Sequence, residues 1–341
     1  MPEKVNVDEY RGIWIFIEQD EGHETRLTLS FEMLGKGREL ADELEVPLTA
    51  VLLGYNVKKL ADEAIFHGAD RVLLADHPKL LQYDTELYSD IIAQKAREEK
   101  PEILLVGASP IGRDLAPTLS FCLKGGCTAD CTELSVDLEK RLLVSTRPAF
   151  GGNVMATIIA PDHRPQMSTV RPGVFAMPER DDNRAGEIIE IPLELDDISP
   201  RVRVLESKKK KVGGGNLLEA EKVVGIGMGA GSKETFDMVA EMAGLLGAEV
   251  AASRPAVEAC WISHDCQVGQ TGKTIRPDLY IACGISGTVQ HTAGMAGAKT
   301  IIAINKDENA EIFKFADYGI VGDINKIAPK IIKALKEMDE G

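Results

Sequence analysis

The sequence predicts an α/β protein in two parts: an N-terminal parallel-sheet domain with added antiparallel strands, then a C-terminal Rossmann-like, doubly wound domain. Two observations carry this prediction. Short apolar runs alternate with helical patterns in both halves of the chain, which is typical of βαβ units. A stretch rich in Lys and Gly at residues 207–216 is too polar to fold alone and separates the halves. We therefore expect domains at residues 1–206 and 217–341, joined by a linker at 207–216.

The N-terminal half begins with apolar runs of strand length, each followed by a helical pattern, as in right-handed βαβ units. The expected strands are residues 12–17, 49–53, 71–75 and 103–106, and the expected helices are residues 30–44, 58–66, 85–99 and 114–123. The Gly- and Ser-bearing turn at Gly107–Asp114 could hold an anion at a helix start. A tight turn docked against a neighbouring surface is the alternative.

After Thr132 the pattern changes to short β-type runs with no helix between them. We expect these runs to add antiparallel strands to the edge of the parallel sheet. They are residues 132–136, 142–146, 154–159 and 167–170. The apolar residues between 188 and 193 are expected to cross to the second domain as an extended strand.

Composition narrows the functional classes. The 341 residues are 44% hydrophobic and 27% charged, which indicates a globular protein. A formal net charge of −15 disfavours nucleic acid and anionic membrane as partners. No apolar run is long enough to span a membrane, and the first residues lack the pattern of a secretory signal, so a cytoplasmic location is expected.

Six cysteines are spread along the chain without a C-x-x-C pair, and no metal-ligand spacing of His and Glu is present. Reduced thiols are the simpler interpretation. A metal or redox pair at Cys127 and Cys131, or at Cys260 and Cys266, is the alternative.

The C-terminal half again alternates strands and helices. Strands are expected at 222–227, 249–253, 279–283, 300–304 and 318–321, and helices at 233–246, 291–296, 310–315 and 326–335. Glycines alternate from Gly225 to Gly231, after a strand and before a helix, where a pyrophosphate turn would lie. Close packing of a helix on the sheet explains the same glycines. With Glu249 as a ribose-binding acid, this turn would suit a nicotinamide-dependent dehydrogenase.

Polar clusters follow the strands between Ser253 and Asp323, where open α/β sheets place ligands. Arg254 directly follows a strand, and its guanidinium beside a flavin ring would stabilise negative charge on the reduced ring. A surface ion pair is the alternative. In the long loop between Pro255 and Pro277, the Thr271 hydroxyl and the Gln270 amide are suited to ring heteroatoms.

Residues 284–291 join a strand to a helix. Backbone N–H groups there, with the Ser286 hydroxyl, would form an anion cradle for a pyrophosphate. His291 could donate to a flavin carbonyl, although a lone histidine is more often part of a core. Asn305 and Asp323 end the next two strands; Asn305 could pair with an adenosine or ribitol group, and Asp323 with a ribose hydroxyl or its own helix start.

These same residues resemble a known family. Ser253-Arg254, Gln267-Val-Gly-Gln-Thr-Gly-Lys273, Gly284-Ile-Ser-Gly287, Gln290-His291 and Ala303-Ile-Asn-Lys-Asp307 closely resemble the α subunit of electron transfer flavoprotein, the FixB family. The resemblance is most specific across about 217–335. It is looser in the first domain, where it is clearest at residues 147–152 and 168–173.

The resemblance implies a heterodimer with an electron transfer flavoprotein β subunit, with FAD bound to the C-terminal domain. It places Arg254, Thr271 and His291 around the isoalloxazine ring. The residues that it implies along the rest of the FAD are Ser253, Val268, Gly269, Gln270, Ser286, Gly287, Thr288, Val289, Gln290, Asn305, Asp323 and Ile324.

The family passes electrons between a flavin dehydrogenase, of the acyl-CoA dehydrogenase type or linked to NADH, and an acceptor. The resemblance leaves open whether the complex bifurcates electrons. Two rival hypotheses are the nicotinamide-dependent dehydrogenase and a nucleotide-binding regulatory module built on the Gly107–Arg113 turn.

One position departs from the family pattern. Met228 stands in the Gly-rich turn where many members carry Arg, so a cation near the cofactor is missing. Lys222, Lys233 or a residue of the β subunit could compensate.

Overall fold

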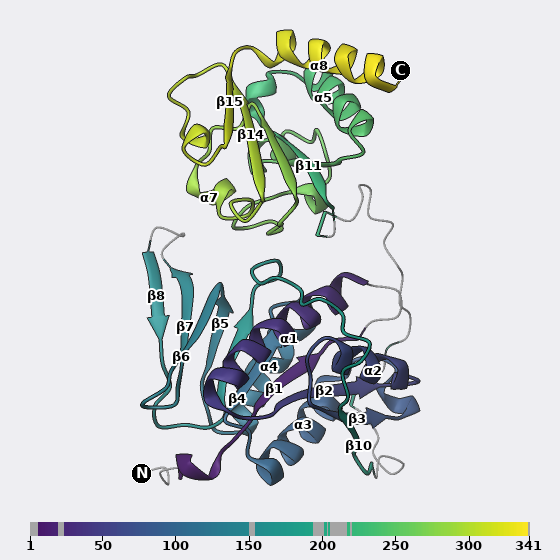
Figure 1. The fold of residues 1–341 in the computed structure, drawn as a ribbon, viewed down its shortest axis with the longest axis vertical. Coiled ribbons are helices and arrows are strands. Elements are labelled where there is room, and N and C mark those ends of the chain that lie inside the picture. The colour runs from purple at the N-terminus through teal and green to yellow at the C-terminus, as the bar shows by residue number, and fades with distance from the viewer. Residues whose placement is uncertain are drawn as a thin grey trace. The chain divides into compact units, whose positions relative to one another are not determined.

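The structure is a computed structural model that describes residues 6–19, 24–149, 154–193, 201–202, 204, 217–218 and 220–339, with the side chains of 24–26 and 338–339 excepted. These residues form two compact units, of which the first contains β1 to β10 and the second β11 to α8 (Figure 1). The linker predicted at 207–216 lies outside the described residues, and the domain bounds stay a prediction.

The first unit is built on a seven-stranded sheet in the order β10-β3-β2-β1-β4-β9-β5. Every neighbouring pair in it is parallel. The alternating pattern predicted this for β1 to β4. The strands are β1 (Ile13–Ile17), β2 (Leu48–Gly54), β3 (Arg71–Asp76), β4 (Ile103–Gly107), β5 (Cys127–Cys131), β9 (Gln166–Val170) and β10 (Glu187–Glu190).

Helices cover both faces of this sheet. Because side chains alternate along a strand, Ile15 of β1 enters one core and Phe16 the other. The first core includes residues of α1 and α2, and the second includes residues of α3 and α4. The helices are α1 (Glu24–Leu44), α2 (Lys58–Phe66), α3 (Thr85–Glu99) and α4 (Pro110–Cys122), with 3₁₀ turns η1 (Val7–Glu9) and η2 (Pro78–Leu80).

The β-rich stretch differs from the prediction. β6 (Glu133–Asp137) and β7 (Leu142–Ala149) pair antiparallel, and with β8 (Val154–Ile158) they form a separate three-stranded sheet. The expectation that 167–170 is antiparallel was wrong. The chain returns from β8 into the space between β4 and β5, where all five residues of β9 are buried and both neighbours run parallel.

Two further differences concern the edges of the main sheet. The residues expected to cross to the second domain form β10, which pairs parallel with β3; Ile188 packs on one core and Ile189 on the other. β5 was not predicted, because it is short, bulged and only partly buried, with Asp130 in the left-handed region at φ +62°.

The second unit contains a five-stranded parallel sheet in the order β12-β11-β13-β14-β15. Residues of α5 and α8 pack together over one face of this sheet (Figure 1). The other face is covered by the long loop, the turn after α7 and η6, through Ile275, Met295 and Ile312. The elements are β11 (Lys222–Ile226), η4 (Met228–Ala230), α5 (Lys233–Leu245), β12 (Glu249–Ala252), α6 (Arg254–Glu258), η5 (His264–Cys266), β13 (Leu279–Cys283), α7 (Val289–Thr292), β14 (Thr300–Asn305), η6 (Glu311–Lys314), β15 (Tyr318–Val321) and α8 (Ile324–Asp339).

This strand order places the ligand crevice. The chain moves from β11 outward to β12 and then returns to β13 on the other side of β11. In an open α/β sheet such a reversal leaves a crevice at the carboxyl ends of the two strands, where ligands bind. Within the described residues, no helix has the length and apolar character needed to cross a membrane.

Candidate cofactor site

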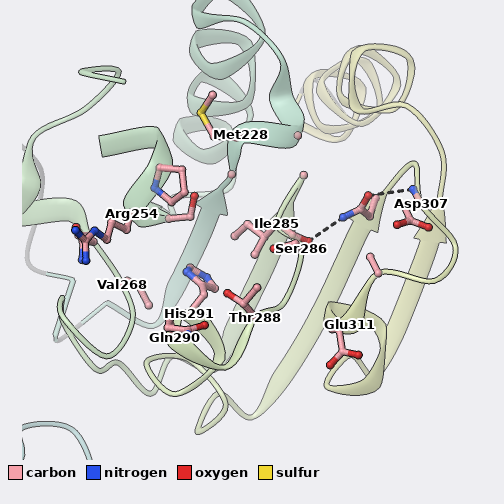
Figure 2. A pocket seen from close by; sticks show the side chains of 18 of the residues that line it. Met228, Arg254, Val268, Ile285, Ser286, Thr288, Gln290, His291, Asp307 and Glu311 are labelled. Carbon is pink, nitrogen blue, oxygen red and sulfur yellow. Dashed lines mark hydrogen bonds between the residues drawn. The ribbon is translucent and has the colours of Figure 1, made fainter. Parts of the chain in front are cut away.

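A cavity of about 640 Å³ lies at the carboxyl ends of the strands of the second unit (Figure 2). Its walls come from the turns that follow β11, β12, β13 and β14, and from the loop at 267–271. The cavity therefore occupies the crevice that the strand order defines between β11 and β13.

Glycines let two of these turns meet backbone to backbone. The N–H of Gly227 donates to the carbonyl of Cys283 at 2.9 Å, and the N–H of Gly229 donates to that of Gly284 at 2.9 Å. A Cβ atom on Gly227 would lie 2.3 Å from the Gly284 oxygen. Glycine is required here for close packing of the two turns, which was one interpretation of the run from Gly225 to Gly231. The turn also lines the cavity, as the interpretation as a pyrophosphate turn requires.

Two hydroxyls at the cavity are not used to cap helices. Ser253 is the N-cap residue of α6 and Thr288 that of α7, and neither side chain bonds to its helix. By contrast, the hydroxyl of Ser232 accepts the N–H of Thr235 at the start of α5. Ser and Thr at N-caps usually satisfy a backbone donor in this way. The hydroxyls of Ser253 and Thr288 are therefore available to a ligand.

Backbone donors lie beside these hydroxyls. The N–H groups of Ser286, Gly287 and Thr288 have no acceptor within the described part of the chain. Gly287 adopts φ +85°, and a Cβ there would lie 2.1 Å from the nitrogen of Ile312. The Ile312 N–H in turn donates to the Ser286 carbonyl at 3.1 Å. Consecutive unpaired N–H groups in a turn held in this way form a suitable cradle for a phosphate.

His291 both lines the cavity and belongs to the buried interior, with 5% of its surface exposed. Its Nε2 lies 2.8 Å from the hydroxyl of Tyr280 on β13. Burial lowers the pKa of His291 to about 4, and the backbone of Val268 offsets this only in part, so the ring is neutral at pH 7. Its Nδ1 is buried and makes no hydrogen bond of acceptable geometry within the described residues.

Arg254 starts α6, and its Nε donates to Glu258 Oε1 at 2.8 Å. The side chain is 64% exposed, so the surface ion pair is present in this structure. Figure 2 shows its guanidinium on the opposite side of the site from Asp307 and Glu311. The cavity therefore carries a cation at one end and carboxylates at the other.

The loop at 267–271 is held against α7. The N–H of Gln270 donates to the carbonyl of Gln290 at 2.7 Å. Gly269 adopts φ +138°, and a Cβ there would lie 2.3 Å from the same oxygen. The Gln267 amide donates to the Thr271 hydroxyl at 2.9 Å, which orients that hydroxyl at the cavity.

Asn305 braces the two turns on the far side of the cavity. Its amide donates to the Ile285 carbonyl at 2.8 Å, and its oxygen accepts the N–H of Asp307 at 3.0 Å. Asp323 instead accepts the N–H of Asn325 at the start of α8, and this bond lowers its pKa. Asp323 does not line the cavity, and Ile324 is buried in the core.

The structure brings most of the predicted site residues together. Those that line the cavity are Ser253, Arg254, Val268, Thr271, Ser286, Thr288, Gln290, His291 and Asn305. Those that do not line it are Gly269, Gln270, Gly287, Val289, Asp323 and Ile324, whose cofactor contacts stay a prediction. Gly227 lines the cavity, as the pyrophosphate interpretation of the glycine run allowed. Sequence reasoning assigned no cofactor contact to Pro255, Gln267, Ile285, Asp307 and Glu311; the position of Asp307 just after a strand was a usable signal.

Met228 lines the cavity and is 44% exposed. Neither lysine suggested to compensate for it lines the cavity. Lys222 donates to the Leu246 carbonyl at 3.4 Å, and Lys233 pairs with Asp237 on α5. Among the lining residues, all of them described, Arg254 is the one with a permanent positive charge. Anion binding here would depend chiefly on backbone N–H groups.

The position of Glu249 does not support the hypothesis of a nicotinamide-dependent dehydrogenase. Glu249 was placed where a ribose-binding acid would lie, at a strand's carboxyl end. It is instead the first residue of β12, paired with Val223, and so lies at the edge of the sheet opposite Ser253. The carboxyl end of β12 presents Ser253 and Arg254.

Among the described residues, no cluster of three or more His, Cys, Asp or Glu side chains could hold a metal ion. All six cysteines are free thiols. Burial raises the pKa of Cys127 to about 12, which disfavours the reactive thiolate there.

Comparison with known proteins gives two family matches. Residues 13–196 match the electron transfer flavoprotein domain, and residues 216–296 match the electron transfer flavoprotein FAD-binding domain. The chain is 50% identical over 336 residues to the electron transfer flavoprotein subunit alpha of Clostridium acetobutylicum, covering 97% of this chain and 99% of that protein. It is 45% identical to the protein FixB of Azorhizobium caulinodans, covering 96% and 89%. It is 41% identical to the acryloyl-CoA reductase electron transfer subunit beta of Anaerotignum propionicum, covering 97% of each.

Proposed function

The chain belongs to the family of electron transfer flavoprotein α subunits and FixB proteins, and on that premise we propose that it binds FAD in the cavity of its second unit. The observation that carries the proposal is the group of unused donors there. Within the part of the chain that the structure describes, the N–H groups of residues 286–288 have no acceptor, and the hydroxyls of Ser253 and Thr288 make no bond to their helices, at a topological switch point. A dinucleotide phosphate and sugar would satisfy them.

The residues around the ring end have distinct tasks. FAD, when bound, supplies the electron-accepting and electron-donating chemistry. Arg254 contributes positive charge that favours the reduced, more negative ring. Thr271, oriented by Gln267, offers a hydroxyl, and neutral His291 offers a buried imidazole without adding charge. Tyr280 holds that imidazole in place.

The partner of the first unit is proposed to be an electron transfer flavoprotein β subunit. The edge strand β8 supports an interface, since Val154, Met155 and Ile158 are 51%, 53% and 38% exposed. Large apolar side chains gathered on one strand are typical of a protein interface.

The electron donor or acceptor is proposed to be a flavin dehydrogenase, either of the acyl-CoA dehydrogenase type or linked to NADH. The relative named as an electron transfer subunit of acryloyl-CoA reductase supports a partner that acts on CoA esters. Electron bifurcation is a separate hypothesis; it requires NADH-dependent reduction of two acceptors at different potentials by the heterodimer with its dehydrogenase.

The test is co-expression of the full chain with an electron transfer flavoprotein β subunit from the same organism. We expect a one-to-one heterodimer that is yellow, and FAD rather than FMN on chromatography of the released cofactor. A colourless heterodimer that takes up no added FAD would contradict the proposal. The nicotinamide-dependent dehydrogenase predicts NAD binding that is lost in Glu249→Gln; the flavin proposal predicts that this variant keeps its full flavin content.

A further inference from the structure

Tyr280 occupies a position that sequence reasoning did not connect with the site. It lies in β13 with 0% of its surface exposed. Its hydroxyl fits against Gly225 of the neighbouring strand β11, where a Cβ atom would lie 1.9 Å from the oxygen. Gly225 is therefore required to make room for this hydroxyl, so the first glycine of the run serves Tyr280 and not a phosphate.

The hydroxyl has one polar partner within the described residues, the Nε2 of His291 at 2.8 Å. Burial raises the pKa of Tyr280 far above its ordinary value, so the oxygen keeps its proton. Burial likewise keeps His291 neutral, so only one of its two ring nitrogens carries a proton. Two arrangements of these two protons are then possible.

In the first, Tyr280 donates to Nε2, and the ring proton resides on Nδ1. In the second, Nε2–H donates to the Tyr280 oxygen, and the O–H of Tyr280 points into the apolar interior with nothing to accept it. The second arrangement leaves a buried donor unsatisfied that the first does not. The first is therefore favoured.

The surroundings of Nδ1 agree with this choice. The backbone of Val268 opposes the fall in the pKa of His291, as an acceptor near a ring N–H does. The N–H of Val268 already donates to the Ala252 carbonyl at 3.0 Å, so the carbonyl is the group left to face the ring. Nδ1 itself makes no hydrogen bond of acceptable geometry.

We propose that Tyr280 is a positioning residue that locks His291 as the neutral Nδ1–H tautomer, which makes Nδ1 a hydrogen-bond donor at the cavity wall formed by His291 and Val268. The other tautomer would present a lone pair there. An N–H at Nδ1 places positive partial charge in this wall and a lone pair would place negative partial charge there, so the tautomer decides the sign of the charge that the wall presents to a bound flavin. This consequence rests on the proposed FAD site, whereas the tautomer itself does not.

The tautomer is measured on the full-length chain without cofactor. Nitrogen-15 NMR of the histidine side chains at pH 7 distinguishes protonated from unprotonated ring nitrogens, and His291→Gln identifies the signals of His291. We expect a protonated Nδ1 and an unprotonated Nε2 in the wild type. In Tyr280→Phe the fraction protonated at Nδ1 should fall and that at Nε2 should rise.

Two further variants separate this role from a general packing role. Tyr318→Phe removes a tyrosine hydroxyl from an exposed position of the same unit and should leave the His291 signals unchanged. Gly225→Ala keeps the hydroxyl but fills its space, and should shift the signals in the direction of Tyr280→Phe. A wild type protonated mainly at Nε2, or an identical tautomer ratio in Tyr280→Phe, would overturn the proposal.

The consequence for the cofactor is tested in the flavin-loaded heterodimer. We expect Tyr280→Phe to keep its FAD content but to show a lower reduction potential than the wild type and Tyr318→Phe. Equal potentials would refute the role toward the flavin. If no variant, the wild type included, binds FAD, the proposed function fails, and the NMR result still decides the tautomer.

Discussion

The carbonyl oxygen of Gly284 accepts a hydrogen bond from the backbone N–H of Gly229 at 2.9 Å. This contact joins the turn that leaves β11 to the turn that leaves β13, at the point where the strand order reverses. The cavity opens beside this junction. Its shape therefore depends on two backbone segments meeting without intervening side chains.

Substitution of Gly227 by Ala tests this junction. The new Cβ would lie 2.3 Å from the Gly284 oxygen, so the two turns must separate. We expect a loss of about 1–3 kcal/mol in the stability of the second unit and a lower FAD content. Unfolding monitored through Trp261 in a Trp14→Phe background and the flavin-to-protein absorbance ratio measure the two effects. Gly244→Ala is the matched control, because a Cβ there meets nothing within 4 Å in helix α5, and it should stabilise by about 0.5–1 kcal/mol.

Thr288→Val tests whether a hydroxyl that does not cap its helix instead forms a hydrogen bond with the ligand. The hydroxyl does not bond to its helix, so its removal should change stability little. If it bonds to FAD, affinity should fall by about 0.5–1.5 kcal/mol, or roughly 2- to 13-fold. Ser232→Ala should behave in the opposite way, losing about 0.5–2 kcal/mol of stability with unchanged affinity, because that hydroxyl caps α5. Isothermal titration and denaturant unfolding of both variants give the answer; parallel behaviour of the two would count against the assignment.

Arg254→Ala tests the one permanent cation at the cavity. Loss of its positive charge should lower the reduction potential of the bound flavin, because the reduced ring loses a stabilising charge. Since the side chain is 64% exposed, screening should keep the effect to about 1 kcal/mol or less. Glu258→Gln removes the ion-pair partner but keeps the guanidinium, and should leave the potential equal or higher. Potentiometric titration of the heterodimer measures both; an unchanged potential in Arg254→Ala would make the residue a surface contact only.

The buried state of His291 predicts a pH dependence. Its pKa is about 4 in the folded protein and near 6.5 when exposed, so the unfolded chain binds more protons between these values. The stability of the second unit should therefore be highest above pH 6.5. It should fall by up to about 3 kcal/mol as the pH decreases to 4. His291→Gln lacks this titration and should show a flatter profile over the same range, followed through Trp261 in a Trp14→Phe background. Profiles with the same slope would show that His291 is not buried as a neutral ring.

Much of the fold was readable from local pattern. Apolar runs of strand length and helical spacing correctly placed four of the seven strands of the first sheet, and they located the polar clusters that follow the strands of the second. The misplaced elements were those whose pairing depends on distant partners. β9 was assigned to an antiparallel edge, yet it lies between β4 and β5. Its sequence contains Gln166, Ser168 and Thr169, which do not indicate a central strand although all are buried.

The site divides in the same way. The sequence by itself indicated which polar side chains line the cavity: Ser253, Arg254, Thr271, Ser286, Thr288 and His291 were named from local pattern, because strand ends and loops are local properties. Only the tertiary structure decided which edge Glu249 occupies, why Gly225 has no side chain, and that Tyr280 bonds to His291. These relationships join residues on different strands and helices. They depend on strand order and register, which no spacing along a single segment encodes.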